Sequence, residues 1–219
     1  DNLSVQISNY NGVNISCKGF SDGWISVDSI FGGLSPYTFN WPNGDSSLLI
    51  DTLLVGWYEG TLIDSLGCIF KHDIQITEPD FALYTEVDTF SVSCNTYCDG
   101  MIIAGTVNGT VNVTGPYLYE WYDNMGNLIS SNDTLDSICA GSYSLTVTDN
   151  NGCVNNLSPS ISEPLFVSIN LDLLVNVSIN GFSNGSISIT ALGGNGNYTY
   201  SWMGPNGYSS TNEDIFGLP

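Results

Sequence analysis

Residues 141–153 read GSYSLTVTDNNGC, and this stretch decides the fold. Apolar residues fill every second position from Tyr143 to Val147 and alternate with small polar residues. This is the period-2 pattern of a strand with one buried face. The strand runs into Asp-Asn-Asn-Gly at residues 149–152, which suits a tight turn, and Cys153 then opens a return strand. The stretch therefore predicts a β-hairpin.

The hairpin sequence has an earlier copy at residues 56–68, GWYEGTLIDSLGC. Six of its positions carry the same residue 85 positions later. The aromatic stretch YTFNW at residues 37–41 also recurs, as YLYEW at 117–121 and as YTYSW at 198–202. Recurrence of this kind indicates a tandem array of small domains. The sequence predicts repeat one at residues 1–79, repeat two at residues 80–164 and repeat three at residues 165–219.

Short alternating strands separated by Gly, Pro, Asn and Asp turns fill each repeat, and nothing has the period of a helix. This pattern predicts an all-β chain of tandem immunoglobulin-like antiparallel β-sandwiches. An acidic residue and a proline join consecutive repeats at Glu78-Pro79 and Glu163-Pro164, without a flexible tether. We therefore expect the repeats to form a semi-rigid rod.

Repeat three stops at Pro219, before the position of its last hairpin. A sandwich without that hairpin leaves core residues such as Trp202 open to water. We therefore expect repeat three to be incomplete here and the natural chain to continue. The chain begins at Asp1 with no signal peptide, which suggests a mature or excised fragment of a longer exported protein.

The tryptophans divide into two groups. Recurrence within the aromatic strand predicts that Trp41, Trp121 and Trp202 are core anchors between the two sheets, rather than a sugar-stacking platform. Trp24 and Trp57 do not recur and are the better ligand candidates. Even so, a partly covered strand residue is the role that we favour for both.

Charge is lopsided, with 22 acidic residues against two basic ones and a formal net charge of -20. Such a surface cannot neutralise phosphates, which argues against nucleic acid and against anionic lipid as partners. No run of 18 apolar residues exists, so we expect no membrane insertion. Acidity on a body rich in Ser, Thr, Asn and Gly is typical of an extracellular β-protein kept soluble by its charge.

Six cysteines in small β-repeats indicate disulfides and an oxidising compartment. Comparison of the repeats matches Cys17 and Cys68 of repeat one with Cys94 and Cys153 of repeat two. Cys98 and Cys139 form an extra pair in repeat two, because repeat one has no cysteine at either position. Repeat three has Ile179 at the position of Cys17. Closing a loop of about fifty residues stabilises by about 4 kcal/mol in the chain-entropy model. Redox or zinc roles are disfavoured because no CxxC exists and His72 is the only imidazole. The predicted disulfides are Cys17–Cys68, Cys94–Cys153 and Cys98–Cys139.

Catalysis has little chemical basis, because one His and two Lys leave almost no general base. We predict no catalytic residue and no required cofactor. Calcium is the alternative, since hard oxygen ligands at repeat ends would stiffen a rod. Turn formation explains the same aspartates without a metal. The calcium candidates are Asp22, Asp64, Asp99 and Asp149.

Three ordered motifs carry a family resemblance: CxGxxDG at residues 17–23, GGxxPYxFxW at 32–41, and GxYxLTVTDxxGC at 141–153. With the closing Glu-Pro of repeats one and two, the chain resembles the SprB-type repeat of cell-surface adhesins in gliding Bacteroidota. The resemblance implies a secreted protein, exported by type IX secretion and displayed on the outer surface of the outer membrane.

The same resemblance implies a function and partners. The repeats would form a stalk and adhesive surface carried by the gliding and secretion machinery, with further repeats of the same chain and a surface polysaccharide or solid substrate as partners. An alternative from another class is a carbohydrate- or calcium-binding accessory module of a secreted enzyme or scaffold. Bacteroidota also O-glycosylate Ser or Thr between Asp and a small or aliphatic residue. The matching positions are Ser29, Thr52, Ser65, Thr134 and Ser137.

Overall fold

A computed structural model describes residues 2–108 and 117–219. The described chain is almost entirely β-structure, in antiparallel sheets, with one 3-10 turn, η1 (Pro205–Gly207). No helix in these two ranges has the length and apolarity needed to cross a bilayer. The predicted all-β, immunoglobulin-like fold class is confirmed.

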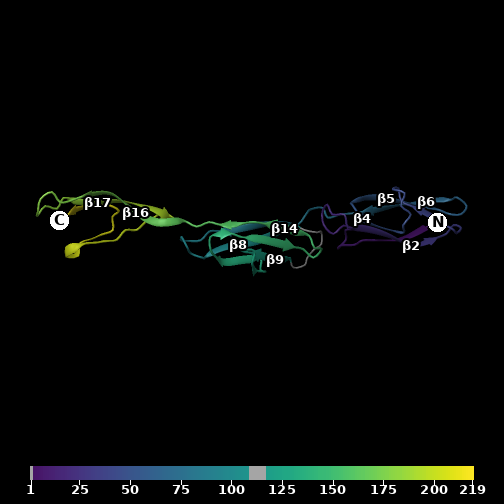
Figure 1. The fold of residues 1–219 in the computed structure, drawn as a ribbon, viewed down its shortest axis with the longest axis horizontal. Helices are drawn as coiled ribbons and strands as arrows, with labels where there is room; N and C mark the ends of the chain where they lie inside the picture. Colours follow the sequence, from purple (N-terminus) through teal and green to yellow (C-terminus); the bar gives the residue numbers. More distant parts are fainter. Residues whose placement is uncertain (1, 109–116) are drawn as a thin grey trace. The chain divides into compact units, whose positions relative to one another are not determined.

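Repeat one forms a sandwich of two three-stranded sheets (Figure 1). Its core mixes residues of both sheets, among them Ile25 and Val27 from the first and Phe39, Leu62 and Ile74 from the second. Alternate positions of each strand supply these side chains, as a period-2 pattern requires. The first sheet has the order β1 (Asn2–Ile7), β2 (Gly23–Phe31), β4 (Leu49–Leu53), and the second β3 (Thr38–Asn40), β5 (Gly56–Ile63), β6 (Ile69–Ile76).

Repeat two follows the same plan. One sheet has the order β11 (Thr134–Ile138), β8 (Gly100–Asn108), β7 (Tyr84–Phe90). The other has the order β10 (Leu128–Ser130), β9 (Leu118–Tyr122), β13 (Ser144–Thr148), β14 (Val154–Leu157). A short pair, β12 (Gly141–Ser142) and β15 (Ser160–Ile161), continues the last two strands.

The hairpin predicted at residues 141–153 is present. Strands β13 and β14 pair from Leu145 opposite Leu157 to Thr148 opposite Val154. Leu145 is fully buried, as the alternation predicts.

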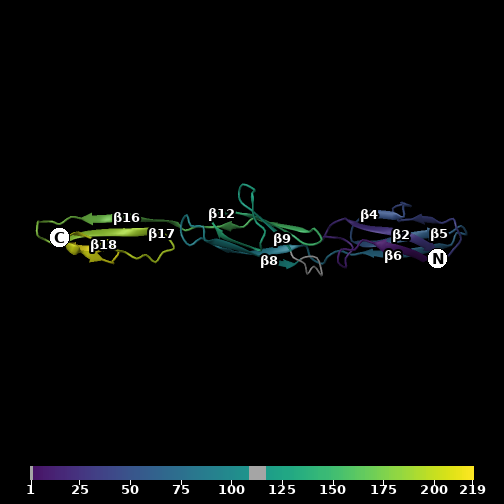
Figure 2. The same ribbon diagram turned by 90° about the horizontal axis from the view of Figure 1, so that it is seen from below.

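Repeat three has a three-stranded sheet of order β16 (Leu165–Val175), β17 (Gly185–Gly194), β20 (Ile215–Leu218) and a short pair, β18 (Trp202–Met203) and β19 (Ser209–Ser210). Figure 2 shows β16 and β17 running side by side. Nothing in residues 165–219 corresponds to β5 and β6 of repeat one.

Strand β16 lacks the cover that the second sheet gives to β1 in repeat one. Val5 opposite Val27 in repeat one corresponds in register to Leu171 opposite Ile189 in repeat three. Val5 packs against the core of repeat one, whereas Leu171 is 60% exposed. Every position of β16 is exposed. The expected uncovering of apolar residues in repeat three is therefore observed.

The three predicted tryptophan anchors differ in burial between the repeats. Trp41 and Trp121 are buried, and Trp202 is half-buried. Each indole Nε1 donates to a backbone carbonyl, at Ser47, Asn132 and Asn212 respectively. The first two indoles are therefore buried in the core, while the third makes the same kind of hydrogen bond but is only half-buried.

In the described residues, no strand pair crosses residue 79 or residue 164, and the three repeat boundaries stay a prediction. By contrast, the contacts between residues group the chain into two compact units rather than three repeats. Unit 1 comprises Asp1–Asp88, Ile103–Thr134 and Tyr143–Pro159, and unit 2 comprises Thr89–Ile102, Leu135–Ser142 and Ser160–Pro219. Repeat one lies in unit 1, repeat three lies in unit 2, and repeat two is divided between them.

Candidate functional site

A turn at residues 16–22, here named the corner turn, carries Cys17. The Ser16 N–H donates to Asp22 Oδ1 at 3.1 Å, and the Phe20 N–H donates to the Cys17 carbonyl at 3.0 Å. Glu78 of the closing Glu-Pro accepts from the Gly19 N–H at 2.8 Å.

Glu78 also ties this turn down through Lys18. Lys18 Nζ lies 2.5 Å from Glu78 Oε1. The hydrogen bond from Lys18, and after it that from the Gly19 N–H, holds the pKa of the Glu78 carboxyl below its usual value. The recurring Glu-Pro thus fastens the corner turn to the end of its repeat.

A second turn at residues 149–153, here named the hairpin turn, carries Cys153. Asp149 Oδ1 accepts from the N–H groups of Asn151 and Cys153, both at 2.9 Å. The Gly152 N–H donates to the Asp149 carbonyl, and Gly152 has φ +84, a conformation that favours glycine. The Asp-x-x-Gly-Cys motif is therefore a self-contained Asx turn that presents a cysteine.

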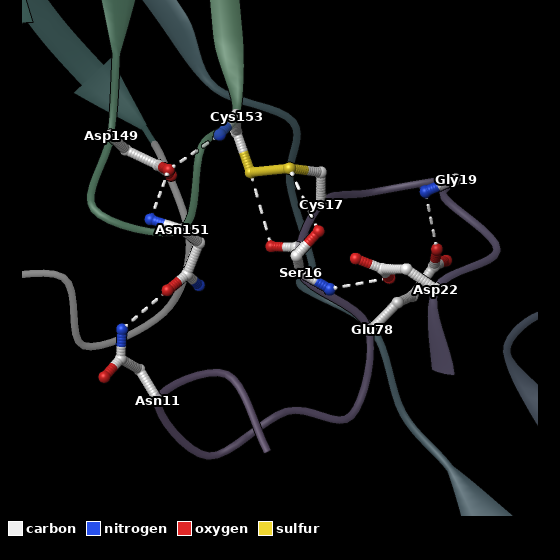
Figure 3. Close-up of a disulfide and its surroundings, with 9 residues drawn as sticks. All are labelled: Asn11, Ser16, Cys17, Gly19, Asp22, Glu78, Asp149, Asn151 and Cys153. Atoms are coloured by element: carbon white, nitrogen blue, oxygen red, sulfur yellow. Dashed lines mark hydrogen bonds between the residues drawn. A yellow bond between two sulfur atoms is a disulfide. The ribbon is translucent and has the colours of Figure 1, made fainter. Parts of the chain in front are cut away.

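The two turns meet in a disulfide between Cys17 and Cys153, with a Cα–Cα distance of 5.5 Å (Figure 3). Both cysteines are 5% exposed. Cys153 Sγ lies 3.3 Å from the Ser16 carbonyl oxygen. Beside the bond, Asn11 Nδ2 donates to Asn151 Oδ1 at 2.7 Å. Repeats one and two are thus covalently joined and packed at this point.

This bond corrects two of the predicted disulfides. Cys17–Cys68 and Cys94–Cys153 do not form; Cys68 and Cys94 are free and exposed. Cys68 directly precedes β6, while Cys17 lies near Glu78 beyond the other end of that strand. An eight-residue strand is about 25 Å long, far more than a disulfide can span.

The third predicted pair, Cys98–Cys139, is present, with a Cα–Cα distance of 3.8 Å. It lies inside repeat two, where it joins the segment before β8 to the end of β11. The paired absence of these two cysteines from repeat one was therefore a valid signal.

The four aspartates considered for calcium all accept backbone N–H groups. Asp22 and Asp99 accept from Ser16 and Ser93, six residues earlier in each case. Asp64 Oδ1 accepts from Leu66 and Cys68 at 2.9 Å, as Asp149 does in its own turn.

Hydrogen bonding favours the ionised carboxylates of Asp64 and Asp99. The Cys68 N–H bond is the main cause of a lowered pKa at Asp64, and hydrogen bonds from Ser93, side chain first, lower the pKa of Asp99. Among the residues described, no three His, Cys, Asp or Glu side chains gather into a group suited to a metal ion. Local turn chemistry accounts for these side chains, and calcium binding stays the alternative to it.

Trp57 lies beside a pocket on repeat one. The side chain is 68% exposed, and the pocket has a volume of about 450 Å³. Its polar lining comes from the loop after β3 and from β4, and includes Asn43, Asp45 and Asp51. The aromatic lining is Trp41, Trp57 and Tyr58. An exposed indole that lines a pocket with both apolar and polar walls is a surface on which a sugar ring could stack.

Trp24 differs from Trp57. It is half-buried in β2, and its backbone exchanges hydrogen bonds with Ser8. Trp24 is not among the residues that line the Trp57 pocket, so the partly covered strand role describes it better.

The five possible O-glycosylation positions are all at least partly accessible. Thr52, Ser65 and Ser137 are exposed, while Ser29 and Thr134 are half-exposed. Thr52 and Ser137 occupy the same place in β4 and β11 and share a left-handed backbone, with φ +59 and +54. Glycan occupancy remains a prediction.

Comparison with known proteins gives a family match and likenesses to solved structures, two of which are described here. The three N-terminal domains of the bacteriophage RB49 highly immunogenic outer capsid protein (Hoc) align with a TM-score of 0.45 and 13% identity, covering 99% of this chain and 80% of that one. The N-terminal four Ig domains of Dscam1 isoform 6.44 align with a TM-score of 0.27 and 12% identity, covering 100% of this chain and 66% of that one. A search of curated proteins finds no match.

The family match agrees with the sequence motifs. The SprB repeat model matches residues 9–46 and residues 174–207. These segments contain the corner turns of repeats one and three and most of the aromatic strands. The match indicates an adhesin-like repeat region of the kind found on cell surfaces, and the disulfides suggest an extracellular protein. Two segments of this chain are therefore similar to the SprB repeat, as its motifs predicted.

Proposed function

We propose that this chain is a non-catalytic stalk and adhesive segment of a large secreted cell-surface adhesin that serves surface attachment and gliding motility. The observation that carries the proposal is the Cys17–Cys153 bond. A covalent link between consecutive repeats resists separation of the repeats under load, which a stalk needs and a freely jointed string of binding modules does not.

Composition and fold support the same function. The net charge of -20 keeps a densely displayed surface protein soluble and self-repelling. Disulfides persist in the oxidising space outside the cell. Type IX export, a Bacteroidota source, contact with the gliding machinery and attachment to polysaccharide or solid surfaces belong to this proposal.

Antibody labelling of intact cells tests it. We expect an antibody against this chain to label unpermeabilised cells, with label that moves along the cell during gliding. We also expect cells lacking the segment to attach to glass less well. Label that requires permeabilisation, or unchanged attachment and gliding without the segment, would contradict the proposal.

The Trp57 pocket favours a second candidate, a carbohydrate-binding module. A stacking indole next to Asn43, Asp45 and Asp51 offers both an apolar face and hydrogen-bonding groups, the combination that sugars require. A glycan array with the whole chain tests this candidate. Saturable binding that Trp57→Ala abolishes and Trp24→Ala retains would establish a lectin-like site on the stalk. Absence of saturable binding, or equal binding by both variants, would remove the candidate.

A further inference from the structure

The free thiols sit in copies of the two turns that are bonded at the Cys17–Cys153 junction. Cys94 lies in a corner turn like that of Cys17. The Ser93 N–H donates to Asp99 Oδ1 at 2.9 Å, the Tyr97 N–H to the Cys94 carbonyl at 3.1 Å, and the Thr96 N–H to Glu163 Oε2 at 2.9 Å. Each bond has its counterpart around Cys17.

Cys68 lies in a hairpin turn like that of Cys153. The Cys68 N–H donates to Asp64 Oδ1 at 2.9 Å, and the Gly67 N–H donates to the Asp64 carbonyl at 3.0 Å. Gly67 has φ +82, close to the +84 of Gly152. The chain therefore has one free cysteine in a corner turn, Cys94, and one free cysteine in a hairpin turn, Cys68.

A second observation shows that the corner turn of repeat two receives the next repeat. Asn195 Nδ2 of repeat three donates to the Ser93 carbonyl at 2.8 Å. In the corner turn of repeat one the matching carbonyl, that of Ser16, lies against Cys153 Sγ of repeat two. In both cases the carbonyl before the cysteine contacts the following repeat.

We propose that Cys68 and Cys94 each form a disulfide with a neighbouring repeat, as Cys17 and Cys153 do with each other. This series of disulfides between consecutive repeats is here named the relay. Cys94 forms its disulfide with the hairpin-turn cysteine of the repeat that follows repeat two, once that repeat has its last hairpin. Cys68 forms its disulfide with the corner-turn cysteine of a repeat that packs before repeat one. The corner turn of repeat three keeps the fold of the others, with Ser178 N–H donating to Asn184 Oδ1 at 3.0 Å, but carries Ile179, so the relay has no cysteine there.

Formation of each bond is a two-electron oxidation, for which a small disulfide such as oxidised glutathione is the oxidant. One cysteine thiolate attacks the oxidant and releases one thiolate, forming a mixed disulfide. The partner thiolate then attacks the protein sulfur of that mixed disulfide and releases the second thiolate. One protein S–S bond forms, one oxidant S–S bond breaks, and the two protons shed by the cysteines pass to the released thiolates.

Thiol mapping of the chain is the first test. After refolding in glutathione redox buffer, we expect alkylation of the denatured, unreduced chain at Cys68 and Cys94 alone, with Cys17–Cys153 and Cys98–Cys139 peptides in the digest. A chain without free thiols, carrying Cys17–Cys68 and Cys94–Cys153, would overturn the relay.

The second test supplies the missing partner cysteine for Cys68. A second copy of residues 1–83 placed before Asn2 reproduces the native linker between β6 and β7. We expect the copied Cys17 to bond Cys68, so that alkylation of Cys68 is lost. The matched control carries Cys17→Ser in the copy, and its Cys68 should be alkylated as in the original chain. Full alkylation of Cys68 in both folded proteins would overturn the proposal.

A complementary variant supplies the partner cysteine for Cys94. Residues 140–164 appended after Pro219 give repeat three a last hairpin and a hairpin-turn cysteine. Loss of Cys94 alkylation and a cross-linked peptide joining Cys94 to the appended copy are expected. The control carries Cys153→Ser in that copy. Alkylation of Cys94 and the appended cysteine together, in a chain whose added hairpin resists proteolysis, would contradict the relay at this end.

Discussion

Gly23 lies so close to Leu53 that a β-carbon on Gly23 would stand 3.0 Å from the Leu53 carbonyl oxygen and 3.2 Å from Ile76 Cγ2. The same approach recurs at Gly100 against Ile138. A third instance joins Gly185 to Leu218, at 3.1 Å from the carbonyl oxygen. Strand packing thus requires the glycine that follows Asp22, Asp99 and Asn184 in the three corner turns.

Gly23→Ala should therefore destabilise repeat one by about 1–3 kcal/mol, because the backbone of β4 must shift to admit a methyl group. Gly105→Ala is the matched control, since a β-carbon there meets nothing within 4 Å. Urea unfolding followed by tryptophan fluorescence measures both. Equal midpoints for the two variants would contradict the packing explanation.

Trp121→Ala should cost about 3–5 kcal/mol, because the fully buried indole leaves a large cavity and an unsatisfied Asn132 carbonyl. Trp202→Ala should cost much less, since its indole makes the matching hydrogen bond but is only half-buried. Urea unfolding with near-UV circular dichroism distinguishes the two. A loss at Trp202 equal to that at Trp121 would mean that repeat three has a core as complete as that of repeat two.

Acid should destabilise the hairpin turn of repeat one. The pKa of Asp64 is lowered in the folded state, first by the Cys68 N–H, so its contribution is fully present above the ordinary value of 3.8 and is lost as pH falls through the lowered folded value. Asp64→Asn keeps an acceptor oxygen without the titration. We expect its unfolding midpoint to fall less between pH 7 and pH 3 than that of the original chain. Parallel curves for the two proteins would rule out this linkage.

Millimolar calcium should leave the unfolding temperature unchanged, because turn N–H groups already occupy Asp22, Asp64, Asp99 and Asp149. Thermal unfolding with calcium and with chelator tests this expectation. Magnesium serves as the control for ionic strength. A rise in unfolding temperature specific to calcium would make these aspartates ligands as well as turn formers.

Local patterns in the sequence were sufficient to predict the strands, the hairpin and the buried tryptophans. The alternation around Leu145 needs only its neighbours to be recognised, and the recurrence of Trp41 as Trp121 needs only a comparison of repeats. The Cys98–Cys139 pair was found because both partners are missing together from repeat one.

The other disulfide pairing could not be found in this way. Cys17 and Cys68 recur as Cys94 and Cys153 whether each cysteine bonds within its own repeat or with the next one. Distance decides between these arrangements, and distance depends on the sandwich. The contacts of Lys18 and Gly19 with Glu78, which place Cys17 beyond the far end of β6 from Cys68, exist only in the folded chain.

The Trp57 pocket was predicted only in part. The lack of a recurring partner marked Trp57 as a ligand candidate, but Asp45 and Asp51 were not identified with it. They come from the loop after β3 and from β4, and only tertiary packing brings these segments to the indole. The left-handed backbone of Thr52 and Ser137 was also missed, although Gly217, at φ +70 in β20, was a visible sign.

The Cys17–Cys153 bond also has a mechanical consequence. Its partners lie 136 positions apart, so tension applied to the two ends of the chain passes from Cys17 directly to Cys153. The polypeptide between them, including β2 to β6 and β7 to β13, carries none of that tension while the bond is intact. About 450 Å of contour length is thus withheld from stretching. Reduction of one covalent bond would release it, which makes the junction a mechanical fuse whose state depends on the redox conditions around the cell.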